Sequence, residues 1–212
     1  MKNKSVELLT DQPAQLQSDL TVVLAHGAGA GMDSDFMVAM AALLCEHGLR
    51  VVRFEFPYMA ERRATGKRRP PNPAPQLLAG FRDVIAQQGG AERCVAAGKS
   101  MGGRMASMLL AESGCRAAVS LGYPFHPPSQ PEKLRAAHWG DIAAPWLIVQ
   151  GTRDPFGGRD EVAGYALPAS CQMDWLEDGD HDFKPRKSSG FTQRQHWQSA
   201  ALSVATFIRG LT

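Results

Sequence analysis

The sequence predicts an α/β fold with a doubly wound, mainly parallel sheet flanked by helices. Short apolar runs recur along the 212 residues, and amphipathic stretches with helical spacing lie between them. Continuous apolar runs are typical of strands that are buried on both faces, as parallel strands are. Glycine, histidine and carboxylate residues follow several of these runs, at the sheet edge where such folds bind ligands. These observations together indicate a sheet whose carboxyl edge carries the functional site.

Each predicted strand is a short apolar run that a loop or a helical pattern follows. Residues 5–9 are a further candidate for a first strand, and residues 11–19 are polar and predict a loop. The clear runs are residues 20–25, 51–54, 94–97, 117–121, 146–150 and 172–176.

The predicted helices show apolar residues at helical spacing, with capping residues at their ends. Asp33 or Ser34 can cap the first helix and Thr192 the last, and Gly48 and Gly210 follow their carboxyl ends. The expected helices cover residues 36–44, 74–85, 101–110, a short segment beginning near 131 or 132, 160–166 and 193–208.

An unusual stretch lies between the second and third of these strands. Residues 58–69 hold five cationic residues against one acid, Glu61, and prolines follow at positions 70, 71, 73 and 75. Proline disfavours regular structure, so we expect an irregular segment. The cations could recognise an anionic acyl or leaving group, but the favoured interpretation is a solvated loop, since charge runs are usually on the surface. No aromatic residues interleave with the cations, which disfavours a nucleic-acid groove.

Composition and charge predict a single domain over residues 1–212. Hydrophobic residues make up 44% and charged residues 21%, and the net charge of +2 does not indicate a nucleic-acid partner. No apolar run approaches the roughly 20 residues of a membrane span, and the start of the chain does not resemble a secretion signal. The four cysteines are far apart, which favours reduced thiols over disulfides or a metal site. We therefore expect a cytoplasmic protein with no metal, no cofactor and no membrane partner, and leave its oligomeric state open.

The segment Gly98-Lys99-Ser100-Met101-Gly102 matches the G-x-S-x-G pattern of a nucleophile elbow. Such a turn from strand to helix holds the serine in a strained conformation that exposes its hydroxyl group. Small residues are needed on either side because the turn is crowded. Five-residue matches also occur by chance, so the remaining loops decide whether Ser100 is a nucleophile.

Two later loops supply the partners that an activated serine needs. His181 follows the last predicted strand and is the candidate base, and Asp154 follows the preceding strand and can orient the imidazole. The rivals for the carboxylate are Asp178, Asp180 and Asp182, which adjoin the histidine. His26 is a rival base, but its place before a glycine-rich loop favours a role in shaping that loop.

The oxyanion hole and the substrate pocket are also expected at this edge. Met101, directly after the serine, offers one backbone N–H group, and the loop at residues 26–31 offers the other, from Ala28 or from Gly27. Residues 123–141 leave room for at most a small cap. The candidate pocket walls are Tyr58, Phe125, His126 and Phe156.

The chain resembles the small α/β hydrolases of the dienelactone-hydrolase type. It is more closely similar to the family of testis-expressed α/β-hydrolase-like proteins and their bacterial relatives. The matching motifs cover about residues 20–210 and are His26–Ala30, Phe54–Met59, Gly98–Arg104, Gly122–Pro128, Gln150–Gly157 and Asp178–Phe183. The resemblance implies the α/β-hydrolase fold with its Ser, Asp, His order along the chain. It also implies that some relatives are subunits of assemblies.

The sequence therefore predicts a serine hydrolase of small-molecule esters or thioesters, with Ser100, Asp154 and His181 as its catalytic residues. A peptidase is a weaker alternative because no large substrate-binding domain is evident. The rival class is a catalytically silent interaction module on the same fold.

Overall fold

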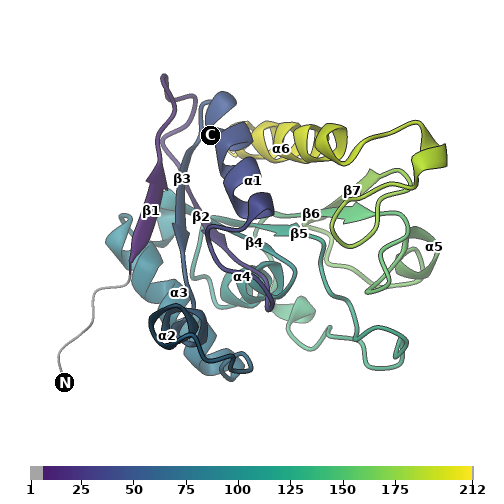
Figure 1. Cartoon of the computed structure of the whole chain (residues 1–212), viewed down its shortest axis with the longest axis horizontal. Coiled ribbons are helices and arrows are strands. Elements are labelled where there is room, and N and C mark those ends of the chain that lie inside the picture. Colours follow the sequence, from purple (N-terminus) through teal and green to yellow (C-terminus); the bar gives the residue numbers. More distant parts are fainter. Residues whose placement is uncertain (1–6, 212) are drawn as a thin grey trace.

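The computed structural model describes residues 7–211, which form a seven-stranded sheet (Figure 1). Its strand order is β1-β3-β2-β4-β5-β6-β7, and only β1 runs antiparallel to its neighbour among the described strands. The predicted doubly wound, mainly parallel sheet is thus confirmed. The strands are β1 (Leu8–Asp11), β2 (Thr21–Ala25), β3 (Arg50–Phe54), β4 (Cys94–Lys99), β5 (Ala117–Leu121), β6 (Trp146–Gly151) and β7 (Cys171–Leu176).

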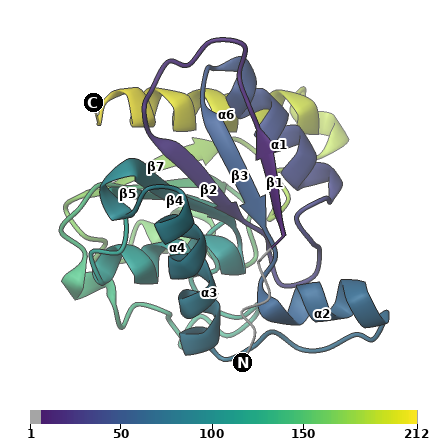
Figure 2. The same cartoon turned by 90° about the vertical axis from the view of Figure 1, so that its left-hand side faces the viewer.

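Helices cover both faces of the sheet. Helices α1 (Asp35–Glu46) and α6 (Gln193–Arg209) pack on one face, while α3 (Ala74–Gln87) and α4 (Met101–Ala111) pack on the other (Figures 1 and 2). The other elements are α2 (Pro57–Thr65), α5 (Arg159–Val162) and the 3₁₀ turns Ala91–Arg93, Trp139–Asp141 and Lys187–Ser189.

The core consists of two apolar clusters, one on each face of the sheet. Successive residues of a strand point to opposite faces, so Val22 and Leu24 join the cluster under α1 and α6, whereas Val23 joins the cluster under α3 and α4. Both strand faces are covered, which is why the central strands read as continuous apolar runs.

Three predictions about local structure differ from the observed elements. Residues 57–65 form helix α2 instead of an irregular segment, because Pro57 occupies the first turn, where proline is tolerated, and the remaining prolines lie beyond Gly66. The helix expected near residue 131 is absent, and only the turn at Trp139–Asp141 forms between β5 and β6. Helix α5 is shorter than the expected 160–166 and ends before Gly164.

Other details agree with the sequence patterns. Thr192 caps α6 through a capping box with Gln195, whereas Ser34 occupies the cap position of α1 without a side-chain bond. The candidate strand at 5–9 lies partly outside the described residues, and β1 begins at Leu8.

The four cysteines are free thiols, of which Cys94 and Cys115 are buried. Within residues 7–211, no helix combines the length and the apolarity needed to cross a membrane.

Candidate active site

Ser100 lies at the sharp turn between β4 and α4, as the G-x-S-x-G pattern predicts. Its backbone has φ +50° and ψ −113°, a region that residues with a side chain rarely adopt. The turn is held by the backbone, since the Ser100 N–H donates to the carbonyl of Leu121 on β5 at 2.9 Å. The strained conformation is therefore supported by the neighbouring strand.

The glycines of the motif are required by close packing of the turn. A Cβ atom added to Gly98 would lie 2.2 Å from the carbonyl carbon of Gly102, and one added to Gly102 would lie 2.5 Å from the carbonyl oxygen of Ala25. Both contacts are with backbone atoms, which cannot move aside without displacing β2 or α4. Any side chain at either position would shift Ser100.

The structure brings Ser100, His181 and Asp154 into one hydrogen-bonded chain. His181 Nε2 lies 2.9 Å from Ser100 Oγ, and His181 Nδ1 lies 2.8 Å from Asp154 Oδ2. A carboxylate oxygen only accepts, so Nδ1 carries the proton and Nε2 is free to accept from the serine hydroxyl. The Asp154 side chain is fully buried, and the His181 side chain is 18% exposed. The arrangement can therefore move a proton from Ser100 to His181 beside a desolvated negative charge.

Asp154 is held in place by hydrogen bonds to both of its oxygens. Its Oδ1 accepts the backbone N–H of Phe156 at 2.8 Å, and its Oδ2 accepts the side-chain amide of Gln150 at 3.0 Å. The other end of the buried Gln150 amide accepts the backbone N–H of Tyr123 at 2.6 Å. Gln150 thus connects the loop after β5 with the carboxylate.

The rival carboxylates have other partners. Asp178 forms an ion pair with Arg186, whose hydrogen bond lowers the pKa of the carboxyl group. Asp180 accepts two backbone N–H groups of its own turn, and Asp182 forms an ion pair with Lys99 at 3.2 Å. Among the candidate carboxylates, Asp154 is the one bonded to the imidazole of His181.

Buried His26 connects the glycine-rich loop to the segment that follows β3. Its Nδ1 donates to the carbonyl of Gly27 at 2.6 Å, and its Nε2 accepts the backbone N–H of Phe56 at 3.1 Å. Burial lowers the pKa of His26, which favours this neutral tautomer. The histidine shapes the loop, as the sequence pattern favours, and is bonded away from Ser100.

The two backbone groups expected to bind an oxyanion come from different parts of the fold. Met101 begins α4, and the first N–H groups of a helix have no partner within it. Ala28 lies exposed in the loop after β2, next to Gly27, where an added Cβ atom would lie 3.7 Å from the Ser100 Cβ. The hydroxyl of Tyr58 lies 3.2 Å and 3.0 Å from the carbonyls of Gly27 and Ala28 and braces the loop.

The predicted pocket walls divide into one partly exposed residue and three buried ones. Phe156 is partly exposed and packs on the His181 ring, with centroids 4.2 Å apart. Tyr58 is 2% exposed and His126 is 3% exposed, with His126 Nε2 lying 2.8 Å from Glu161. Phe125 is fully buried within an aromatic cluster that includes Tyr123 and Trp139. For Tyr58, Phe125 and His126 the structure favours a role in loop packing over contact with a ligand.

Lys99 is a site residue that sequence reasoning missed. Its ammonium group donates to the backbone carbonyl of His181 at 2.7 Å and lies near the Asp182 carboxylate. Burial lowers the pKa of Lys99, while Asp182 opposes this shift. The lysine therefore ties the His181 loop to the elbow. A signal was available, because a charged residue within a buried strand needs a partner.

The fold and the hydrogen-bonded serine, histidine and aspartate define the class of α/β hydrolases. The family model for the alpha/beta hydrolase domain matches residues 18–209, and the chain belongs to that family. This assignment supports a hydrolase.

Three solved structures share the fold. Dienelactone hydrolase from Anabaena variabilis is 20% identical, with 95% of this chain and 90% of that chain covered and a TM-score of 0.69. Est1E from Butyrivibrio proteoclasticus is 14% identical, with 96% and 94% covered and a TM-score of 0.69. An alpha-beta serine hydrolase homologue from Coxiella burnetii is 17% identical, with 98% and 92% covered and a TM-score of 0.65.

Proposed function

We propose that the chain is a serine hydrolase that cleaves carboxylic esters or thioesters. The observation that carries the proposal is the hydrogen-bonded chain from Ser100 Oγ through the His181 ring to the buried carboxylate of Asp154. Serine alone is a weak nucleophile, and this arrangement supplies both a base and a group that stabilises the protonated base.

In the proposed reaction, Ser100 Oγ attacks the carbonyl carbon while His181 Nε2 takes the hydroxyl proton. The tetrahedral intermediate places its oxyanion toward the N–H groups of Met101 and Ala28, each of which contributes about 3–4 kcal/mol in comparable sites. The intermediate collapses, and His181 returns the proton to the departing alcohol or thiol. Water then attacks the acyl-serine by the same route and releases the acid. The reaction needs no cofactor.

The surroundings of Ser100 favour small or extended acyl groups. The only regular element between β5 and β6 in the described structure is the 3₁₀ turn at Trp139–Asp141, so these strands carry no helical cap between them. Phe156 beside His181 is the proposed contact for the substrate.

Within the family, we propose a closer relationship to the testis-expressed α/β-hydrolase-like proteins, a cytoplasmic location, and no nucleic-acid or membrane partner.

The test is hydrolysis of 4-nitrophenyl esters of several acyl lengths. Ser100→Ala should lower kcat by on the order of 10⁴- to 10⁶-fold, because the nucleophile is lost, and Asp154→Asn should lower it by about 10⁴-fold. Ser199→Ala, on the exposed face of α6, is the matched control and should leave kcat unchanged. Undiminished turnover by Ser100→Ala would exclude Ser100 from the reaction.

A further inference from the structure

Arg104 and Arg135 are two partly buried arginines that form no ion pair within residues 7–211. Arg104 is on α4, and Arg135 is in the segment between β5 and β6. Both side chains are half-buried. Arg135 Nη1 donates to the backbone carbonyl of Pro124 at 3.3 Å. The Nε atom of Arg104 is buried and has no hydrogen-bond partner in the described structure.

No carboxylate of residues 7–211 lies within ion-pair distance of either guanidinium group. Burial is the main cause that lowers the pKa of Arg135. The positive charge of Arg104 lowers this pKa further. The charge of Arg104 also affects His138. Burial and this charge lower the pKa of His138 to about 4, although Asp141 opposes the shift. Two like charges that are partly desolvated raise the free energy of the folded state unless an anion joins them.

The position of Arg104 relates this cluster to the proposed nucleophile. Arg104 is four residues after Ser100, and its backbone N–H donates to the Ser100 carbonyl at 3.0 Å. Residues four apart share one face of a helix, and helical side chains lean toward the amino end. The long Arg104 side chain is therefore directed toward the end of α4 that carries Ser100. Met101 and Met108 are also partly exposed on this face.

The segment that carries Arg135 reaches the same edge of the sheet. It follows β5, whose last residue Leu121 accepts the backbone N–H of Ser100. Buried Tyr123 lies just after β5 and connects this end of the strand to Arg135, because its hydroxyl donates to the Arg135 carbonyl at 3.3 Å. His138 is anchored to α4 by Ser107, whose hydroxyl lies 2.8 Å from His138 Nε2. The cluster is thus built from two elements fixed to each other.

We propose that Arg104 and Arg135 form a subsite that binds an anionic oxygen group, a carboxylate or a phosphate, of the ester or thioester substrate. The inference rests on the proposed function and names the substrate class for the same site. Guanidinium groups match the geometry of both anions and can bind either with two parallel hydrogen bonds. No acceptor of the described residues satisfies the Nε donor of Arg104.

Matched substrate pairs test the subsite. Mono-4-nitrophenyl glutarate carries a carboxylate on the acyl group and is compared with neutral 4-nitrophenyl valerate. A second pair, 4-acetoxybenzoate and its methyl ester, places the carboxylate on the leaving group. Arg104→Gln and Arg135→Gln should each lower kcat/KM for one anionic member by roughly 10- to 100-fold relative to its neutral partner. The pair that responds identifies which end of the substrate is bound.

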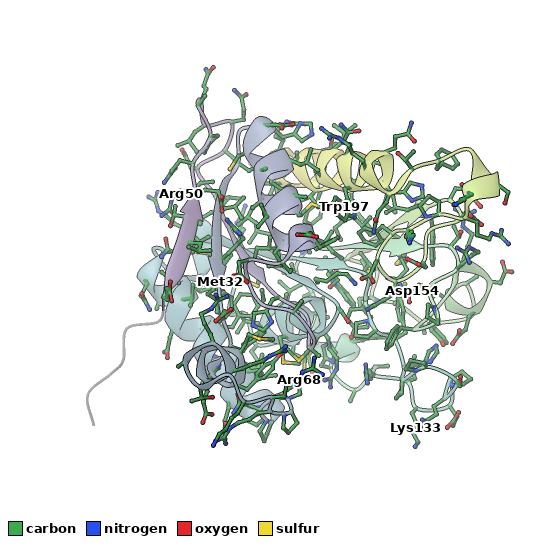
Figure 3. All side chains as sticks on the ribbon, in the orientation of Figure 1. Met32, Arg50, Arg68, Lys133, Asp154 and Trp197 are labelled. Carbon is green, nitrogen blue, oxygen red and sulfur yellow. The ribbon has the colours of Figure 1, made fainter. Side chains whose placement is uncertain are left out.

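The control is Arg68→Gln, an exposed arginine on the segment after α2, which Figure 3 shows apart from Asp154. It should change the anionic-to-neutral ratio by less than about twofold, as a screened surface charge does. Equal losses for both members of each pair, or an equal effect from Arg68→Gln, would overturn the subsite. Inhibition of the wild type by glutarate and by inorganic phosphate distinguishes the two anions.

Calorimetric titration with glutarate and with inorganic phosphate separates this inference from the proposed function. It needs no turnover. Binding to the wild type that Arg104→Gln and Arg135→Gln both weaken would support the subsite even if no ester were hydrolysed. Ester hydrolysis with unchanged ratios in both variants would overturn the subsite and leave the hydrolase standing. If one variant fails to fold, as judged by circular dichroism, the other decides.

Discussion

The arginines on the α2 side and those on the α4 side differ in whether an acidic residue pairs with them. On the side of α2, Arg63 forms ion pairs with Glu55 and Asp33, which raise its pKa. On the side of α4, the pKa of Arg135 is lowered by burial and by Arg104. On the α2 side, Arg63 and Arg69 have acidic partners, whereas neither arginine of the α4 side forms an ion pair in the described structure. A run of charges along a chain is therefore a poor guide to charge that is free to bind a ligand.

The arginines on the α2 side also have a structural role. Arg62 donates to the carbonyl of Gly29 at 3.2 Å, and Arg69 forms an ion pair with Glu61. The Arg62 contact and the Tyr58 hydroxyl hold α2 against the loop that presents Ala28, and the Arg69 ion pair ties the segment after α2 to that helix. The basic stretch is largely exposed, as its interpretation as a solvated loop predicts, but residues 58–65 belong to helix α2 and not to a loop.

A third cation, Lys99, should give the largest effect because its partner is the His181 loop. Lys99→Met removes the bond to the His181 carbonyl, and we expect kcat to fall by about 10²-fold, as small displacements of catalytic groups can cause. The Michaelis constant should change little. Lys99→Arg keeps the charge and should restore part of kcat, and an equal loss in both variants would indicate damage to packing alone.

Breaking the pairing on the α2 side should lower stability. Glu55 is buried and accepts two hydrogen bonds from Arg63. Because Arg63 is exposed, Glu55→Gln should reduce the free energy of unfolding by only about 1–2 kcal/mol. Urea denaturation measures this loss. A variant as stable as the wild type would show that the ion pairs of Arg63 contribute nothing.

Loosening the bracing of the glycine-rich loop should produce a smaller loss of activity. Tyr58→Phe removes one hydroxyl and keeps the ring, so a hydrogen-bond contribution of about 1 kcal/mol predicts roughly a fivefold fall in kcat/KM. Steady-state kinetics with a neutral ester checks this value. Unchanged kcat/KM would mean that the loop holds Ala28 without the hydroxyl.

Removing an arginine on the α4 side should raise the free energy of unfolding instead of lowering it. Arg104→Gln relieves repulsion with Arg135 and should raise the free energy of unfolding by about 0.5 kcal/mol at low salt. The gain should shrink as salt screens the repulsion. Thermal unfolding at two ionic strengths measures it. A clear loss of stability would indicate that Arg104 has a structural partner.

The smallest effect concerns pH. The folded protein lowers the pKa of His138 from 6.5 to about 4, so between these values the unfolded chain binds more protons. Stability is therefore fully present above about pH 6.5 and decreases as the pH falls toward 4. His138→Gln should flatten this part of the profile, though His26 keeps some slope because its pKa is also lowered. Identical profiles for variant and wild type would contradict the shift.

Local sequence patterns predicted the strands and the loop residues Ser100, Asp154 and His181, because each feature is encoded by a few consecutive residues. Gln150 and the pair Arg104 and Arg135 carry no such local signal. Their roles depend on partners far away in sequence, such as Tyr123 for Gln150, which a single sequence does not bring together. Phe125 is expected to line the pocket but is fully buried, since an aromatic residue after a strand can equally turn inward.

Covalent labelling by a fluorophosphonate tests most directly whether Ser100 is the nucleophile. Intact-protein mass spectrometry should show one adduct on the wild type, and peptide mapping should place it on Ser100. Ser100→Ala should remain unlabelled, and Ser199→Ala should be labelled like the wild type. An unlabelled wild type, or an adduct that persists in Ser100→Ala, would contradict the assignment of Ser100 as an activated nucleophile.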